Sequence, residues 1–464
     1  MPHNLISRPR KDTLTLTVLD GRRLNAWRKG LTAAQRGWLE QTGFTGRPDS
    51  WAMLQNQKGG IKGAVFVTGD ATDMWSWSTL AARLPKGSYK VAGRLSRAMA
   101  NDAALGWGLA AYEFTRYRAA RITRPDLVWP AGADIAAVRQ MLDATTLLRD
   151  LINTPAEDLG PSELTSEARK VGRKYKARTR VIAGDALLGA NYPMIHTVGR
   201  ASDDVPRLID MRWGTKGPRV TLVGKGVCFD TGGLDLKPAA GMLRMKKDMG
   251  GAAHALALAQ LIMAAKLPVR LRVLIGAVEN AVAGNAYRPW DVLQTRKGIT
   301  VENANTDAEG RLVMGDCLAE ACREKPDMLL DFSTLTGAAR VAVGTGLAAV
   351  FANDDKLYAD LEKQGAATSD PMWRLPLHRP YRKLLDSKVA DISSASDGPF
   401  GGAITAALFL QEFVDDDVPW AHFDIMAWNT GNSPGRPTGG EAQGLRAAFG
   451  AIKARFGNQR GAGD

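Results

Sequence analysis

Three consecutive stretches near the middle of the chain decide its fold class: RVTLV at 219–223, GAAHALALAQLIMAA at 251–265 and VRLRVLIGAV at 269–278. The first and third are short apolar runs that suit buried strands. The second is long and apolar enough for a buried helix. Strands that alternate with helices at this spacing build largely parallel sheets, so we expect an α/β fold.

The same alternation continues on both sides of these stretches. We expect further strands at Thr13–Leu19, Gly63–Val67, Met328–Phe332 and His422–Ile425. We expect helices at Leu80–Arg83, Val91–Ala100, Gly106–Tyr117, Ile135–Leu151, Gly315–Cys322 and Ile404–Val414. The stretch Arg118–Ala133 contains two prolines and mixed charge, which is typical of a domain boundary. We therefore predict a small N-terminal α/β domain over 1–130 and a larger α/β domain over 131–464.

Composition excludes several classes of protein. The 464 residues include only three scattered cysteines, too few for a disulfide framework. No apolar run reaches the roughly 18 residues needed to cross a bilayer. The N-terminus has basic residues without a following apolar segment, unlike a secretory signal. We expect a cytoplasmic protein with no membrane association.

The net charge of +13 is concentrated in the N-terminal part. Residues 1–130 contain 20 Lys and Arg against 9 Asp and Glu, a balance of +11. Such a basic segment can attract nucleic acid. It can equally be a solvated surface that aids solubility, since no nucleic-acid-binding motif accompanies it. Weak DNA binding through this segment is therefore an alternative role.

Familiar catalytic motifs are missing from the sequence. The five histidines never form H-E-x-x-H, and C-x-x-C does not occur, which argues against a histidine or thiolate zinc site. G-x-S-x-G is also absent. Gly224-Lys225-Gly226 lacks the first glycine and the Ser or Thr of a phosphate-binding loop.

Four carboxylates instead mark an unusual region: Asp230, Asp248, Asp307 and Glu309. Asp307 and Glu309 are two residues apart, so in an extended segment both would face the same side. Carboxylates that point at one another repel unless a proton or cation lies between them. Four of them suffice to share two divalent ions, a centre that activates water for hydrolysis. The same residues are also common in turns and helix caps, and spacing alone leaves both interpretations open.

Longer motifs resemble those of a known family and so add information that residue spacing alone cannot provide. The run Asn305-Thr-Asp-Ala-Glu-Gly-Arg-Leu312 is similar to the signature of the cytosol (leucine) aminopeptidase family. Other similar segments follow in order over about 145–464: Arg149–Pro155, Val223–Gly226, Phe229–Gly233, Lys237-Pro238, Met245–Gly251, Glu279-Asn280, Tyr287–Pro289, Thr334–Gly337, Gly401–Ala407 and Trp420–Ile425. The N-terminal 130 residues show no comparable signature.

The resemblance implies a metal-dependent aminopeptidase, a hydrolase with a mixed central sheet flanked by helices in its catalytic domain. Asp230 and Glu309 would bridge two divalent ions, zinc or manganese. Lys225 and Asp248 would complete one ion, and Asp307 the other. The catalytic side chains would be Lys237, facing the developing oxyanion, and Arg311, holding a bicarbonate ion that accepts a proton.

The resemblance also implies how substrates bind. Peptides with a free N-terminus would be the substrates, with the α-amine held by one metal and Asp248, beside Lys237. A side-chain pocket would be lined by Met245, Thr334, Gly337, Met426 and Asn429. The family usually has a small residue where this chain has Met426, and often an apolar one at Asn429, so we expect a shallower pocket. Members of the family assemble as homohexamers.

Overall fold

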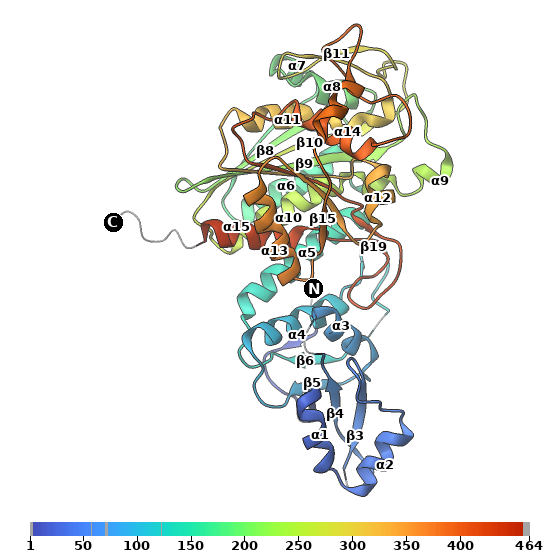
Figure 1. Ribbon diagram of the computed structural model, residues 1–464, viewed down its shortest axis with the longest axis vertical. Coiled ribbons are helices and arrows are strands. Elements are labelled where there is room, and N and C mark those ends of the chain that lie inside the picture. The colour runs from blue at the N-terminus through green and yellow to red at the C-terminus, as the bar shows by residue number, and fades with distance from the viewer. Residues whose placement is uncertain (1–2, 57, 70–72, 122, 458–464) are drawn as a thin grey trace. The chain divides into compact units, whose positions relative to one another are not determined.

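The computed structural model describes residues 3–56, 58–69, 73–121 and 123–457 (Figure 1). The chain forms two compact units. The first extends to Thr146 and includes Gly431–Thr438. The second comprises Leu147–Thr430 and the residues from Gly439 onward. The predicted division at 130/131 falls between a short strand, Asp126–Val128, and helix α5, Ile135–Asn153.

The first unit contains a six-stranded sheet in the order β1-β6-β5-β2-β4-β3. Its strands are β1 Leu5–Ile6, β2 Leu14–Leu19, β3 Trp51–Gln55, β4 Ile61–Val67, β5 Ser88–Val91 and β6 Asp126–Val128. Only the β3–β4 pair in this sheet is antiparallel. The described helices that lie wholly within this unit are α1 Gly21–Lys29, α2 Ala33–Gln41, α3 Met74–Arg83 and α4 Arg97–Ala110.

Two hydrophobic clusters pack on the strands of this sheet. Trp77 of α3 and Trp107 of α4 are fully buried with Phe66 in one cluster. Leu24 of α1 and Leu39 of α2 belong to the other. Strands alternate their side chains between faces, which lets β2 and β4 contribute to both clusters.

The second unit is built on an eight-stranded sheet in the order β15-β14-β17-β13-β9-β10-β8-β7. Its strands are β7 Arg178–Ala183, β8 Arg207–Trp213, β9 Arg219–Asp230, β10 Arg270–Asn280, β13 Met328–Ser333, β14 Ala348–Ala352, β15 Met372–Arg374 and β17 Trp420–Asp424. The central strands β17, β13, β9 and β10 are parallel, whereas β7, β8 and β14 form antiparallel pairs. The expectation of an α/β fold with a mixed sheet is confirmed.

Helices cover both faces of this sheet (Figure 1). α10, Gly250–Ala264, and α6, Pro161–Lys174, contact one face, while α11, Glu309–Cys322, and α8, Pro193–Gly199, contact the other. The remaining helices are α7 Ala186–Gly189, α9 Ala239–Met242, α12 Gly337–Val343, α13 Asp355–Ala367, α14 Gly402–Gln411 and α15 Leu445–Phe456. Short 3₁₀ helices are η1 Ala156–Asp158, η2 Met245–Met249, η3 Thr306–Ala308 and η4 Arg379–Leu385. Two small sheets consist of β11 Val292–Gln294, β12 Thr300–Glu302 and β16 Ile392–Ser393, and of β18 Trp428–Asn429 and β19 Gly439–Gly440.

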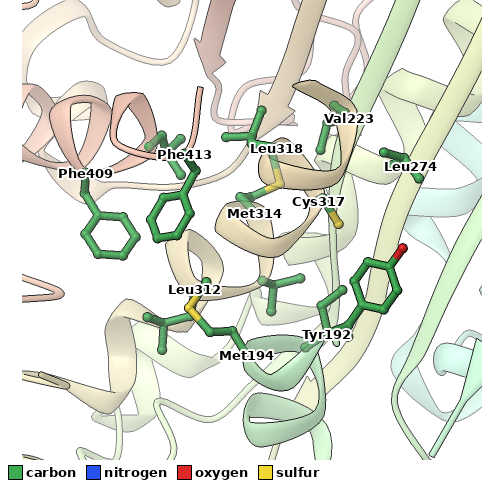
Figure 2. Close-up of a cluster of buried hydrophobic side chains, with 14 of the residues drawn as sticks. Tyr192, Met194, Val223, Leu274, Leu312, Met314, Cys317, Leu318, Phe409 and Phe413 are labelled. Atoms are coloured by element: carbon green, nitrogen blue, oxygen red, sulfur yellow. The ribbon is translucent and has the colours of Figure 1, made fainter. Parts of the chain in front are cut away.

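A large buried cluster joins α8, α11 and α14 to the sheet. Figure 2 shows Met194 of α8, Met314 of α11, Phe413, which follows α14, and Val223 of β9 as members of this cluster. Apolar burial on this scale fixes the position of α11. The start of α11, which carries Glu309, is thereby held against the central strands.

Two predicted segments differ from the structure. The helix expected over Val91–Ala100 begins only at Arg97, because Val91 ends β5 and Ser96 caps α4. The helix expected over Gly106–Tyr117 ends at Ala110. Among the described residues, none of the helices is long and apolar enough to span a membrane.

Candidate metal centre and active site

The functional residues gather where the central parallel strands end. Asp230 is the last residue of β9 and pairs in register with Asn280, the last residue of β10. β13 runs parallel to β9 on its other side and leads into Thr334. Ligands of open α/β sheets characteristically bind beyond these carboxyl ends.

Three of the predicted carboxylates come together here. Asp230, Asp307 and Glu309 each offer an oxygen within 4.8 Å of the others. Asp307 lies in η3 and Glu309 begins α11. These residues are not extended, because the chain has already entered helical turns there. The two side chains nevertheless meet, beside Asp230.

Two lysines lie among these carboxylates and divide them into two groups. Nζ of Lys225, from within β9, lies 2.6 Å from Oδ2 of Asp248 and 2.7 Å from Oε1 of Glu309. Nζ of Lys237 lies 2.8 Å from Oδ2 of Asp230 and also contacts Asp307. The structure thus brings together all five predicted metal ligands and the predicted catalytic lysine.

Burial and mutual repulsion raise the proton affinity of two carboxyl groups. Desolvation, with repulsion from Asp230, raises the pKa of Asp307 to about 6. The same two causes hold the pKa of Glu309 well above its usual range. Burial would also raise the pKa of Asp248, but Lys225 and Lys247 lower it to about 2. The centre thus binds protons where it lacks a compensating cation.

For the two lysines, burial and the neighbouring charges act on the pKa in opposite directions. Burial alone would lower the pKa of Lys225, but Asp248, Glu309 and Asp230 raise it above its ordinary value. Burial alone would also lower the pKa of Lys237, but Asp230 and Asp307 raise it above its ordinary value. Both amines are therefore ammonium groups in the protein without metal.

The donor set fits divalent cations. Oδ2 of Asp248 and Oε1 of Glu309 are buried, and the Lys225 ammonium that a metal ion would replace is the polar partner recorded for them among the described residues. A Cβ on Gly310 would lie 2.6 Å from Nζ of Lys225, and one on Gly232 would lie 3.1 Å from Oδ1 of Asp307. The absence of a Cβ at Gly232 and Gly310 thus leaves space beside these ligands. Carboxylate oxygens and an amine suit several divalent ions.

Arg311, the other predicted catalytic residue, is buried in the first turn of α11. Its Nη1 donates a hydrogen bond of 2.7 Å to the carbonyl oxygen of Ser394, and its Nε has no hydrogen-bond partner among the described residues. Burial lowers its pKa to about 10, although Glu309 opposes this. An unpartnered guanidinium edge this deep can hold a small anion.

The five residues of the predicted side-chain pocket come from three segments of the second unit. Met245 begins η2, Thr334 lies between β13 and α12, Gly337 begins α12, and Met426 and Asn429 follow β17. Thr334 donates from Oγ1 to Oδ1 of Asp248 at 2.7 Å, which ties this set to the carboxylates. Met426 is buried.

Several supporting residues received no predicted role. Nδ2 of Asn280 donates to Oδ1 of Asp230 at 2.8 Å and to the carbonyl oxygen of Thr306 at 3.0 Å. The hydroxyl of Tyr287 donates to that same carbonyl oxygen at 2.7 Å. These bonds hold η3 against the end of β9. Both residues lie within the motifs Glu279-Asn280 and Tyr287–Pro289, which was the available signal.

Comparisons with known proteins agree with this geometry. Residues 146–449 match the catalytic domain of the cytosol aminopeptidase family, and residues 14–130 match the M17 aminopeptidase N-terminal domain. A probable cytosol aminopeptidase of Nitrobacter hamburgensis is 40% identical over 396 residues, 80% of this chain and 75% of that protein. The crystal structure of the cytosol aminopeptidase from Coxiella burnetii is 45% identical, with a TM-score of 0.92 over 98% of this chain and 99% of that chain. The bottromycin maturation enzyme BotP in complex with Mn is 30% identical, with a TM-score of 0.83 over 96% of this chain and 99% of that chain.

Proposed function

Because this chain belongs to the cytosol aminopeptidase family, a family of peptidases, we propose that it releases N-terminal amino acids from peptides at a centre of two divalent metal ions. The observation that carries this proposal is the cluster of Asp230, Asp307 and Glu309 at the ends of β9 and α11, with oxygens within 4.8 Å of one another. Carboxylates approach this closely inside a protein where a cation is to be bound.

The ion pairs suggest how the ligands are shared. Lys225, Asp248 and Glu309 form one group, and Lys237, Asp230 and Asp307 form the other. Asp230 and Glu309, one from each group, offer oxygens within 4.8 Å of each other and would be shared by the two ions. Lys225 would lose its proton when it binds one ion, since two adjacent dications disfavour an ammonium group.

When bound, the two metal ions would supply polarisation of the substrate's scissile carbonyl and a water molecule that ionises near neutral pH, and bicarbonate would supply a proton acceptor. Zinc and manganese are the proposed ions, and BotP was solved with Mn. Arg311 would hold bicarbonate at its unpartnered Nε. Lys237 would turn its ammonium group to the oxyanion that develops on the scissile carbonyl.

Asp248 would receive the free α-amine of the substrate, which restricts the enzyme to the N-terminal residue. The side-chain pocket of Met245, Thr334, Gly337, Met426 and Asn429 would then select that residue. Assembly as a homohexamer in the cytoplasm is proposed by analogy with the family. Nucleic-acid binding by residues 1–130 stays a prediction.

The test is a comparison of metal content and activity. Chelated protein reloaded separately with zinc and manganese should bind two ions per chain and hydrolyse leucyl amides. Glu309→Gln removes a bridging ligand at nearly constant size, so metal content and hydrolysis should both fall. Glu40→Gln, at an exposed glutamate of α2, is the control and should change neither. Full hydrolysis by Glu309→Gln would overturn the assignment.

A further inference from the structure

Two positive side chains without a close anionic partner lie beside the proposed side-chain pocket. Lys247 belongs to η2, directly after Met245 and Lys246, and Arg340 belongs to α12, three residues after Gly337. Arg340 lies next to Gly337, and Lys247 lies near the oxygen of Asp248 to which Thr334 donates. Neither is needed to hold metal in the proposed function.

Lys247 is only 1% exposed. Its Nζ has no hydrogen-bond partner among the described residues, and the nearest carboxylate oxygen recorded for it is Oδ1 of Asp248, 3.9 Å away. That same oxygen accepts the hydrogen bond from Thr334, a pocket residue. A lysine is almost never buried this fully without a partner, so the missing partner is informative.

Arg340 is half-buried, and its side chain has no hydrogen bond or ion pair among the described residues. Nη2 of Arg340 lies 3.4 Å from the point that a Cβ on Gly337 would occupy. Helical side chains lean towards the N-terminal turn, and residues three apart share a face. Arg340 therefore covers the Gly337 side of the pocket, and glycine at 337 leaves the guanidinium uncovered.

Neighbouring charges do not satisfy these two cations. Asp424 is the nearby carboxylate, but its oxygens already accept hydrogen bonds from the hydroxyl and amide of Thr336 and the amide of Leu335. Lys246 shows the ordinary arrangement for comparison. Its Nζ donates to the carbonyl oxygen of Asn153 at 2.6 Å and lies over the ring of Trp428.

We propose that Arg340 binds the carboxylate of the substrate's first side chain and that the buried charge of Lys247 adds to the attraction, so that the enzyme prefers peptides that begin with glutamate or aspartate. This inference rests on the proposed function. With its α-amine at Asp248, a substrate would direct its first side chain towards Thr334 and Gly337, and Arg340 lies beside Gly337. Guanidinium and ammonium groups bind carboxylates through charge-assisted hydrogen bonds. Asn429 adds a polar group to the same wall.

The test compares glutamyl, glutaminyl and leucyl amides of one fluorescent leaving group. Glutamate and glutamine differ in charge but hardly in shape, so their ratio of kcat/KM isolates the carboxylate. These substrates have no C-terminal carboxylate, so any preference must come from the side chain. We expect a glutamyl-to-glutaminyl ratio of about tenfold or more for the native protein. Arg340→Gln and Lys247→Met should each lower this ratio by about tenfold, while Arg340→Lys should retain part of it.

Arg323→Gln, at an exposed arginine that follows α11, is the matched control and should leave the ratio unchanged. Leucyl hydrolysis by Arg340→Gln shows that this variant is folded and active. A native ratio near one, with good leucyl hydrolysis, overturns the proposal and leaves the aminopeptidase function standing. If Glu-Ala is preferred over Glu-Ala-amide while the ratio is near one, the cations bind the C-terminal carboxylate instead, which also overturns it. Failure to hydrolyse any of the amides after metal reloading would contradict the proposed function itself.

Discussion

Replacement of Gly310 by alanine should weaken metal binding, although alanine has a higher intrinsic helix propensity than glycine. Gly310 lies in the first turn of α11, where alanine is favoured over glycine by about 1 kcal/mol. The new Cβ, however, would lie 2.6 Å from Nζ of Lys225. The amine would have to retreat by about 0.8 Å to reach ordinary van der Waals contact.

Lys225 has little room for such a retreat. It is 2% exposed and its Nζ is held at 2.6 Å by Asp248 and 2.7 Å by Glu309. Crowding of a packed interior by one methyl group typically costs about 1–3 kcal/mol. Metal–ligand distances tolerate only about 0.2 Å, so a displaced Lys225 would no longer complete its ion. We expect Gly310→Ala to lose at least one metal ion and most of the peptidase activity.

The assay combines thermal unfolding of the chelated protein with calorimetric titration of manganese. Gly37→Ala is the matched control, because Gly37 lies inside α2 and its Cβ would meet nothing within 4 Å. That variant should be stabilised by about 1 kcal/mol and should bind metal normally. The reasoning would be refuted if Gly310→Ala behaved like Gly37→Ala in both measurements.

Three further changes probe other groups. Lys237→Ala should lower kcat by about 10²–10³-fold with little change in KM, and a steady-state profile in which only KM changes would contradict its role. Met426→Ala should deepen the side-chain pocket, and an unchanged leucyl-to-alanyl ratio of kcat/KM would remove Met426 from the wall. Burial lowers the pKa of His254 to about 4. Between about pH 6.5 and 4, His254 is therefore protonated in the unfolded chain but not in the folded chain. The free energy of unfolding should therefore fall by about 3 kcal/mol between pH 6.5 and 4, and denaturant unfolding of His254→Gln should show a shallower pH dependence.

The sequence predicted the elements whose pattern is local. β9, β10 and α10 were expected because each is a continuous apolar run, and such runs are buried wherever they lie. β9 is nevertheless longer than its apolar run, since it continues through Gly224 and Lys225 to Asp230. A lysine inside a central strand contradicts simple polarity rules, and only the carboxylates of distant segments make it stable there.

The site was predictable as a list of residues but not as an arrangement. Composition and spacing indicated carboxylates, and the resemblance to a known family supplied their roles. Neither could show that η3 is fixed by Asn280 and Tyr287, because those contacts depend on the register of β9 with β10. The sequence likewise could not show that Lys247 is buried without a hydrogen-bond partner, because nothing in it distinguishes Lys247 from its neighbour Lys246.

The two ion-paired lysines explain how the protein can fold before any metal arrives. Asp230, Asp248, Asp307 and Glu309 would carry four negative charges into a largely buried site, which is costly without compensation. Lys225 and Lys237 supply two positive charges, and the raised pKa values of Asp307 and Glu309 allow protons to supply the rest. Two dications would replace these charges, so metal uptake should release protons and strengthen as the pH rises. Lys225 thus serves both conditions: as an ammonium group it holds Asp248 and Glu309 together, and as a neutral amine it would bind the ion that displaces its proton.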